Sequence, residues 1–314
     1  MEFRVSSGPA RAAQAAVLLD GRSFLEGPRW HDGRLWASDQ YLGEVIALDP
    51  DSGAVEVMAR TVGQPAGLGW LPDGRLLIVS MADRRLLRQE PDGDLVTHAD
   101  LSGYCGGPLN DLVVDAAGHA YAGNFGFDLM AGEPARPTVL VRVDPDGTTS
   151  VAAKDLSFPN GAVIIPPAGP AGPAGGTLVV AETFGHRLTA FDVAADGALG
   201  GPRLWADLTD GARRAPGLPA DDRPTAPDGV CADAEGALWV ADAFHNRVLR
   251  VREGGEVVDE VSTGVEGAYA CALGGGDGHT LFVCTARSFV PEERAATRDS
   301  KVLAYRVGVP AAGR

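Results

Sequence analysis

Short runs of hydrophobic residues, separated by glycine-containing turns, dominate the chain. One pattern recurs six times: a turn glycine, then bulky or alternating hydrophobic residues, then a small or polar residue. The copies occupy residues 32–39, 73–80, 117–124, 175–182, 235–242 and 277–284. Runs of this length between turn residues are typical of β-strands. No segment shows convincing helical periodicity, so the pattern predicts an all-β protein built from a repeated unit.

The spacing of the copies indicates the size of that unit. Their turn glycines are Gly33, Gly74, Gly118, Gly176, Gly236 and Gly278. The steps between them are about 40 to 60 residues, and the shorter steps match a four-stranded propeller blade. The longer steps contain insertions at residues 126–138, 166–176 and 210–226, which we interpret as loops.

A second pair of short strands follows each copy, often with an Asp-Gly turn such as those at residues 92–93, 146–147 and 196–197. The whole chain, residues 1–314, is therefore predicted to form one six-bladed β-propeller domain with four antiparallel strands per blade. The sixth unit lacks its fourth strand, whereas residues 14–19 form an extra strand before the first unit. We expect this N-terminal strand to complete the last blade and close the ring, which removes two exposed sheet edges.

Composition and charge narrow the class of protein. The chain contains 42 Gly and 22 Pro, 45% hydrophobic and 22% charged residues, as in a soluble globular protein rich in turns. Its net charge of −15 argues against a nucleic-acid or membrane partner, because either would require a basic surface. No apolar run approaches the ~20 residues of a membrane span. We predict a cytoplasmic protein that acts on a small molecule.

Several reactive residue types are assigned structural roles. The four cysteines form no CxxC pair and are predicted to be free and mostly buried. His186 and His245 occupy equivalent turn positions in two units. Glu182 and Asp242 end the second strands of their units and are expected to bind loop backbone groups. The spacing of the residues suggests no Ser-His-Asp arrangement.

The first strand of each blade lines the central channel of a propeller, so the residues that begin these strands are candidates for a site. They are Glu26, Ala66, Asn110, Asn160, Asp228 and Glu266. Carboxylates that converge on one axis repel unless they are protonated or neutralised by a cation. Ligands that offer only oxygen suit Ca²⁺, Mg²⁺ or Mn²⁺, with Zn²⁺ also admissible. The alternative is that the Asn-Gly and Asp-Gly pairs only form turns.

Four short motifs lie around these positions: Glu-Gly-Pro at 26–28, Pro-x-Asn-Asp at 108–111, Phe-Pro-Asn-Gly at 158–161 and Pro-Asp-Gly at 227–229. With them, the chain resembles the gluconolactonase, luciferin-regenerating enzyme and senescence marker protein family of six-bladed hydrolases, over about residues 18–306. The resemblance implies one divalent ion, preferentially calcium, bound by Glu26, Asn160 and Asp228. It also implies that Asn110 contacts the substrate or a metal-bound water.

The predicted function is a metal-dependent hydrolase that opens a lactone, in which Asp228 could also act as general base. Family members that act on sugar acids tend to carry an Arg where this chain has Pro108. The substrate could therefore be a sugar-acid lactone or a less polar cyclic ester. Alternatives are a non-catalytic propeller that binds partners around a structural ion, and a metal-dependent esterase or organophosphate hydrolase.

Two loop regions near the predicted channel mouth allow two interpretations each. Hydrophobic side chains could line a less polar pocket or simply pack within their loops; they are Tyr104, Phe125, Phe127, Leu129, Met130 and Phe184. Residues 209–226, just before Asp228, could form a lid or a solvated insertion.

Overall fold

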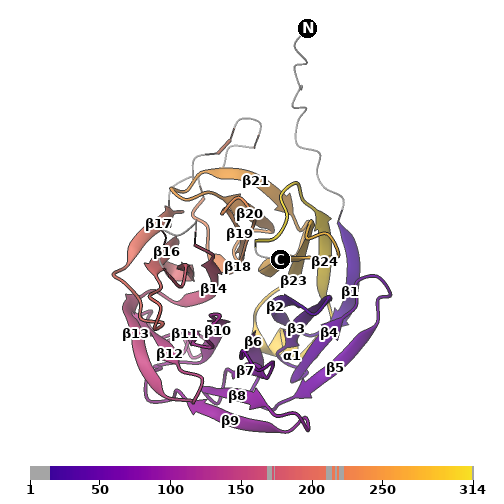
Figure 1. Cartoon of the computed structure of the whole chain (residues 1–314). Helices are drawn as coiled ribbons and strands as arrows, with labels where there is room; N and C mark the ends of the chain where they lie inside the picture. Colours follow the sequence, from indigo (N-terminus) through magenta and orange to yellow (C-terminus); the bar gives the residue numbers. More distant parts are fainter. Residues whose placement is uncertain are drawn as a thin grey trace.

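Six four-stranded antiparallel sheets surround a common axis in the structure of the chain, a computed structural model (Figure 1). It describes residues 15–167, 172, 174–209, 214–215, 218 and 223–312. The architecture confirms the predicted six-bladed β-propeller with four antiparallel strands per blade. The innermost strand of each blade is the one through which the chain enters that blade from the preceding one.

The first three blades follow one another along the chain. Blade one consists of β2 (Leu25–His31), β3 (Arg34–Asp39), β4 (Glu44–Leu48) and β5 (Val55–Arg60). Blade two consists of β6 (Pro65–Trp70), β7 (Leu76–Ser80), β8 (Arg85–Gln89) and β9 (Leu95–Asp100). Blade three consists of β10 (Leu109–Val114), β11 (Ala120–Asn124), β12 (Thr138–Val143) and β13 (Thr149–Leu156).

The last three blades continue the ring, and the sixth takes its outer strand from the N-terminal part of the chain. Blade four consists of β14 (Pro159–Ile165), β15 (Thr177–Glu182), β16 (Arg187–Asp192) and β17 (Arg203–Asp207). Blade five consists of β18 (Pro227–Ala232), β19 (Leu238–Asp242), β20 (Arg247–Val251) and β21 (Val257–Ser262). Blade six consists of β22 (Gly267–Gly274), β23 (Thr280–Ala286), β24 (Ser300–Arg306) and β1 (Ala16–Arg22).

Strand β1 closes the ring as predicted. It pairs antiparallel with β24, and Arg22 lies opposite Ser300. The Arg22 side chain then ties this strand to blade one, because its Nε lies 2.8 Å from Asp39 Oδ2 and its Nη2 donates to Glu44 Oε2 at 2.6 Å. The described strand begins at residue 16, so residue 14 of the predicted strand lies outside the described residues.

The turn glycines explain why the repeat is visible in the sequence. All six have positive φ, between 74° and 94°, a backbone conformation that glycine adopts without steric cost. Each lies in the turn between the first and second strands of its blade. The pattern of turns thus sets the strand boundaries within the blades.

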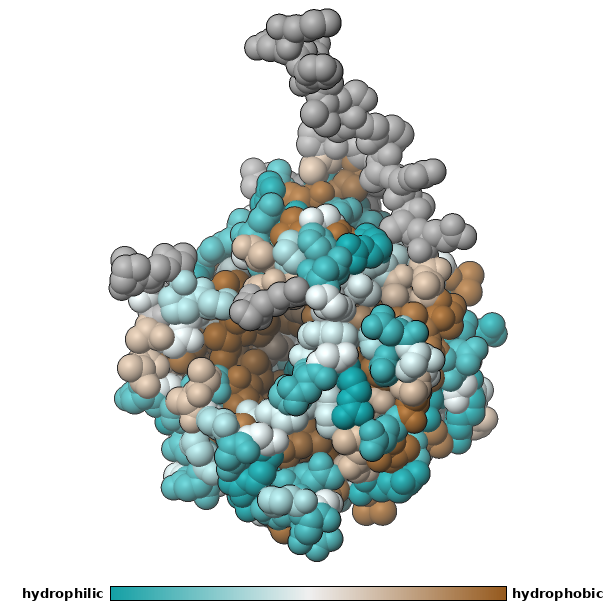
Figure 2. Space-filling view, turned by 45° about the vertical axis from the view of Figure 1, so that its right-hand side comes forward, coloured by the Kyte–Doolittle hydropathy of each residue, from teal (hydrophilic) through white to brown (hydrophobic). Residues whose placement is uncertain are grey.

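Hydrophobic packing between blades forms the core. Six clusters of buried side chains are each shared by two neighbouring blades, and together they pass around the ring. The innermost strands of adjacent blades also contact one another, including β2 and β22 where the ring closes. On the face seen in Figure 2, hydrophobic side chains appear inside a hollow with hydrophilic residues around it. Each blade is therefore stabilised mainly by its two neighbours.

Two short helical segments depart from the expectation that the chain has no helix. They are the 3-10 turn η1 (Thr183–Gly185) and the helix α1 (Pro291–Ala296). Six residues are too few to produce a recognisable helical period in a sequence. Helix α1 is fixed by Arg294, which is buried, pairs with Asp299 and points toward blade one, where it lies 3.4 Å from Ser23 O. None of the helices in the described part of the chain is long and apolar enough to cross a membrane.

The cysteines are free, as predicted. Three of them are buried, and Cys231 is partly exposed. Cys231 Sγ lies 3.7 Å from Cys271 Sγ across the contact between blades five and six.

Candidate functional site

The second residue of each innermost strand lies at the same structural position in all six blades. The pairing register between first and second strands is interrupted directly after this position in blades one and six, and in blades two to five the interruption spans it. Such bulges bend a strand and redirect its side chains. This position carries Glu26, Asn110, Asn160 and Asp228 in blades one, three, four and five.

Glycine follows this position in blades one, two, four and five, because the innermost strands approach one another closely. A Cβ at Gly161 would lie 2.5 Å from Asp228 O, and one at Gly229 would lie 2.5 Å from Ala270 Cα. Neither glycine has positive φ, and both lie inside strands. The interpretation of Asn160-Gly161 and Asp228-Gly229 as mere turn formers is therefore wrong.

Acidic residues at the ends of three second strands hold the segments that lead into these positions. Asp39 accepts hydrogen bonds from the backbone N–H groups of Ser23 and Phe24, just before Glu26. Glu182 accepts from the N–H of Ser157 at 2.7 Å, and Asp242 accepts from the N–H of Ala226 at 3.1 Å. The prediction that Glu182 and Asp242 bind loop backbone is confirmed.

The two histidines considered in the sequence also take structural positions in their turns. His186 Nδ1 lies 2.8 Å from Thr225 O, and His245 Nδ1 lies 2.8 Å from Asp242 Oδ2. His186 therefore contacts the connection between blades four and five, His245 contacts the end of β19 within blade five, and neither lines the central cavity.

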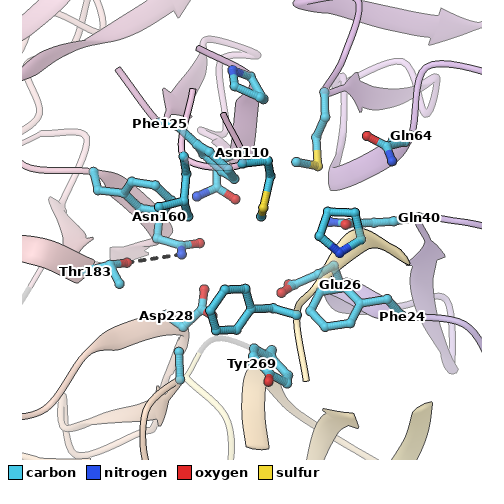
Figure 3. A pocket seen from close by; sticks show the side chains of 18 of the residues that line it. Phe24, Glu26, Gln40, Gln64, Asn110, Phe125, Asn160, Thr183, Asp228 and Tyr269 are labelled. Atoms are coloured by element: carbon cyan, nitrogen blue, oxygen red, sulfur yellow. Dashed lines mark hydrogen bonds between the residues drawn. The ribbon is translucent and has the colours of Figure 1, made fainter. Parts of the chain in front are cut away.

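The four polar positions meet at one cavity on the propeller axis. This cavity opens to solvent. In Figure 3, Glu26, Asn110, Asn160 and Asp228 point into the same space from four different blades. The structure thus brings together all four residues selected from the sequence.

Glu266 does not belong to this group, contrary to the sequence interpretation. Gly267 begins β22, so Ala268 occupies the position equivalent to Glu26. The Glu266 carboxylate instead accepts a hydrogen bond from Thr285 Oγ1 at 2.8 Å and pairs with Lys301. The Glu266-Gly267 pair resembles Glu26-Gly27 of blade one. However, β22 begins at Gly267, after the glutamate, whereas β2 begins at Leu25, before it.

The two carboxylates at the cavity are electrostatically unfavourable in their ionised forms. Burial, and next the nearby Asp111 carboxylate, raise the pKa of Glu26 to about 8. Burial and then repulsion from Glu26 raise the pKa of Asp228 well above its usual value. Asp111 itself is paired, because Arg29 Nη2 donates to its Oδ1 at 2.7 Å. A cation between Glu26 and Asp228 would remove this repulsion.

The two amides are held differently. Asn160 Nδ2 donates to Thr183 Oγ1 at 3.2 Å, and Thr183 Oγ1 donates to the carbonyl of Pro227 at 2.8 Å (Figure 3). This arrangement commits the Asn160 nitrogen to the protein and leaves its carbonyl oxygen for a ligand. Asn110 Nδ2 is buried and has no hydrogen-bond partner among the described residues, so a bound molecule or water is needed to satisfy it.

The donor set fits a hard divalent cation. Two carboxylates and an oriented amide oxygen supply only oxygen ligands, as Ca²⁺ and Mg²⁺ prefer. Among the described residues, no group of three or more His, Cys, Asp and Glu side chains is placed to hold a metal ion, which leaves this mixed carboxylate and amide set as the candidate.

Hydrophobic side chains form most of the cavity wall. Of the residues considered near the channel mouth, Phe125, Leu129, Met130 and Phe184 line it. Phe127 is buried among core residues, and the Tyr104 hydroxyl lies 3.0 Å from Thr149 Oγ1, so these two pack within the protein. Much of the predicted lid at residues 209–226 lies outside the described residues.

Fold and site together define a six-bladed propeller whose axial cavity presents an all-oxygen set of side chains. The family model described as SMP-30/Gluconolactonase/LRE-like region matches residues 24–287. The chain belongs to this family.

Individual relatives agree with that placement. A 6-deoxy-6-sulfogluconolactonase of Pseudomonas putida is 29% identical over 204 residues, which are 64% of this chain and 62% of that protein. The match thus spans less than two thirds of that relative's length. The structure of a calcium-binding regucalcin of Agrobacterium tumefaciens has a TM-score of 0.75 and 23% identity, with 96% of both chains covered. A gluconolactonase of Xanthomonas campestris gives a TM-score of 0.68 at 23% identity, covering 95% of this chain and 90% of that one. These two structural likenesses establish the fold.

Proposed function

We propose that the protein is a lactonase that depends on a divalent cation. The observation that carries this proposal is the convergence of Glu26, Asn110, Asn160 and Asp228 in one cavity from four separate blades. A propeller that only binds partners has no need for buried carboxylates in its axial cavity. Membership in a gluconolactonase-like family and the names of the relatives from Pseudomonas and Xanthomonas support a lactone as the substrate.

Glu26, Asn160 and Asp228 are the proposed cation ligands. Calcium is the first choice, since the donors are all oxygen and a structural relative is a calcium-binding protein. Magnesium, manganese and zinc are the alternatives to be tested. Glu26 and Asp228 supply the negative charge, whereas Asn160 adds an oxygen without further repulsion.

A divalent cation supplies two effects when bound at such a site: it polarises a carbonyl group and lowers the pKa of water. Asp228 then accepts a proton from the attacking water as general base. The water oxygen adds to the lactone carbonyl carbon, the ring C–O bond breaks, and Asp228 passes the proton it accepted from water to the ring oxygen, which leaves as a hydroxyl group. Asn110 Nδ2, which has no partner in the described protein, donates a hydrogen bond to the substrate.

The test measures acid release from lactones at constant pH, using protein stripped with chelator and then loaded with each cation in turn. We expect turnover only in the loaded protein. Asp228→Asn should reduce kcat by about 10²- to 10⁴-fold, the usual contribution of a general base. Asp92→Asn, in an exposed turn of blade two, is the matched control and should leave kcat unchanged.

Cation binding by the same variants is measured by calorimetry. An Asp228→Asn protein that binds the cation and retains full turnover would show that Asp228 is not the base. A wild-type protein that binds the cation and hydrolyses no lactone would instead be a binding protein.

A further inference from the structure

We propose that the substrate of this site is an uncharged lactone that carries a hydrophobic alkyl or aryl substituent. This inference rests on the proposed lactonase function and specifies its substrate. It follows from the juxtaposition of a polar cavity floor, an aromatic wall and the absence of cationic side chains among the described lining residues.

The aromatic residues of the chain are concentrated at this one cavity. The whole sequence has only 10 Phe, 5 Tyr and 5 Trp. Six of the phenylalanines and two of the tyrosines line the cavity. Eight aromatic side chains on one cavity give its wall a largely apolar surface, which is suited to contact an apolar molecule.

The rings form two groups that face each other across the cavity. On one side, Phe158 lies 4.3 Å from Phe125 and 4.9 Å from Phe184, measured between ring centroids. On the other side, the ring of Phe24 lies 4.8 Å from that of Tyr269. Figure 3 shows Phe125 on the side of Asn110, and Phe24 and Tyr269 on the opposite side. A flat or extended apolar group between them would contact both.

The cavity mouth continues this apolar surface into solvent. Met130, Phe244 and Phe289 all line the cavity and are 49%, 52% and 42% exposed. Such exposure is unfavourable in the free protein, because water contacts large apolar side chains. Burial of these three side chains by a substrate would recover that free energy, so the substituent is expected to extend to the mouth.

Polar groups on the walls are few and uncharged. Gln40 and Gln64 line the side of blades one and two, and neither carboxamide makes a hydrogen bond within the described part of the chain. They are available to a ring oxygen or hydroxyl group of the substrate. No Lys, Arg or His belongs to the described lining, whose carboxyl groups are those of Glu26 and Asp228.

This electrostatic character separates the site from one for an acidic sugar. The Pseudomonas relative is named for a lactone with a sulfo group. An anion of that kind requires a cationic or multiply hydrogen-bonding partner on the protein. Pro108 lines this cavity and offers neither. A sulfonate or carboxylate on the substituent of the substrate would therefore meet no cationic side chain among the described lining residues.

A series of δ-lactones that share the six-membered ring tests the proposal. The substrates are δ-valerolactone, δ-octalactone, δ-decalactone and D-glucono-δ-lactone, assayed with the cation-loaded protein. Each buried methylene is worth about a factor of 4 in binding. We expect kcat/KM to rise with chain length, by roughly 30-fold or more from δ-valerolactone to δ-decalactone. D-glucono-δ-lactone should be at least about tenfold poorer than δ-decalactone.

Variants at the cavity mouth test whether its exposed side chains contact the hydrophobic substituent of the substrate. Met130→Ser and Phe244→Ser replace exposed side chains, so the fold should persist. Each should lower kcat/KM for δ-decalactone by about three- to tenfold relative to kcat/KM for δ-valerolactone, measured with the same variant. Leu204→Ser is the matched control, since Leu204 is 60% exposed on β17 and does not line the cavity. Calorimetry with the lactam analogue of δ-decalactone, which is not hydrolysed, measures the affinity of each variant directly. The wild type and Leu204→Ser should bind this lactam more tightly than Met130→Ser and Phe244→Ser do.

The outcomes separate the two proposals. Preferential hydrolysis of D-glucono-δ-lactone, or no dependence on chain length, overturns the hydrophobic substrate and leaves the lactonase function standing. If no lactone is hydrolysed but the lactam binds, the lactonase function is overturned. A wild-type protein that neither hydrolyses a lactone nor binds the lactam overturns both.

Discussion

Thr183 connects two parts of the candidate site. Its hydroxyl group accepts a hydrogen bond from Asn160 in blade four and donates one to Pro227, directly before Asp228 in blade five. One side chain therefore sets the orientation of two proposed ligands. Residues that orient ligands in this way commonly affect metal affinity almost as much as the ligands do.

Thr183→Val tests this role with a side chain of the same shape. The change leaves Asn160 Nδ2 and Pro227 O without their partner, at a cost of about 1–3 kcal/mol in the free energy of unfolding. Cation affinity should also fall by about tenfold, because the Asn160 amide is free to rotate. Thr97→Val, on the exposed strand β9, is the control. Equal cation affinities for the two variants in calorimetry would show that Thr183 does not position the site.

The contrast between Glu26 and Glu266 shows what sequence patterns omit at the residue scale. Both are followed by glycine at the beginning of an innermost strand. Glu26 is the second residue of β2, whereas Glu266 precedes β22 by one residue. This offset of two residues places Glu266 against Lys301 and outside the cavity. Strand register, which depends on pairing with the neighbouring strand, decided between them.

At the scale of elements, the closing strand β1 determines whether blade six is complete. It covers the edge of β24, and Arg22 connects it to Asp39 and Glu44 of blade one. Asp39 in turn holds the backbone before Glu26. A strand from the N-terminal part of the chain therefore supports the polar site through a chain of contacts.

Deletion of residues 1–22 should destabilise the protein strongly. It exposes the hydrogen-bonding edge of β24 and removes the Arg22 ion pairs, so we expect the melting temperature to fall by roughly 10 °C or more. Deletion of residues 1–14 keeps β1 whole and is the control. Circular dichroism melting compares the two truncated proteins. Equal melting temperatures would mean that β1 contributes little to ring closure.

At the scale of the whole molecule, the proposed cation joins blades one, four and five through Glu26, Asn160 and Asp228. Without it, the acidic groups oppose folding when they ionise. The pKa of Glu26 is about 8 in the folded protein, against an ordinary value of 4.5. Between these values the folded protein binds more protons than the unfolded chain, so stability falls as the pH rises. Asp228, whose pKa is also raised, acts in the same direction.

The cation-free protein should therefore melt several degrees lower at pH 8.5 than at pH 6. Glu26→Gln should reduce this decline, because glutamine does not ionise. Calcium should raise the melting temperature of the wild type more at pH 8.5 than at pH 6, as protons compete for the same oxygens, and should have little effect on the Glu26→Gln protein. Differential scanning calorimetry in the presence and absence of chelator measures both effects. A wild-type decline with pH no steeper than that of Glu26→Gln would contradict the assignment.

The sequence by itself determined the architecture, because each blade is a local unit. Turn glycines with positive φ and short hydrophobic runs specify hairpins from nearby residues, and their sixfold recurrence specifies the propeller. Only the tertiary structure decided which polar residues share the cavity and what surrounds them. Glu26, Asn110, Asn160 and Asp228 come from four separate blades, and the aromatic wall comes from these same blades and from blade six. Their meeting depends on strand bulges and on close packing between blades, which are contacts between residues far apart in the chain.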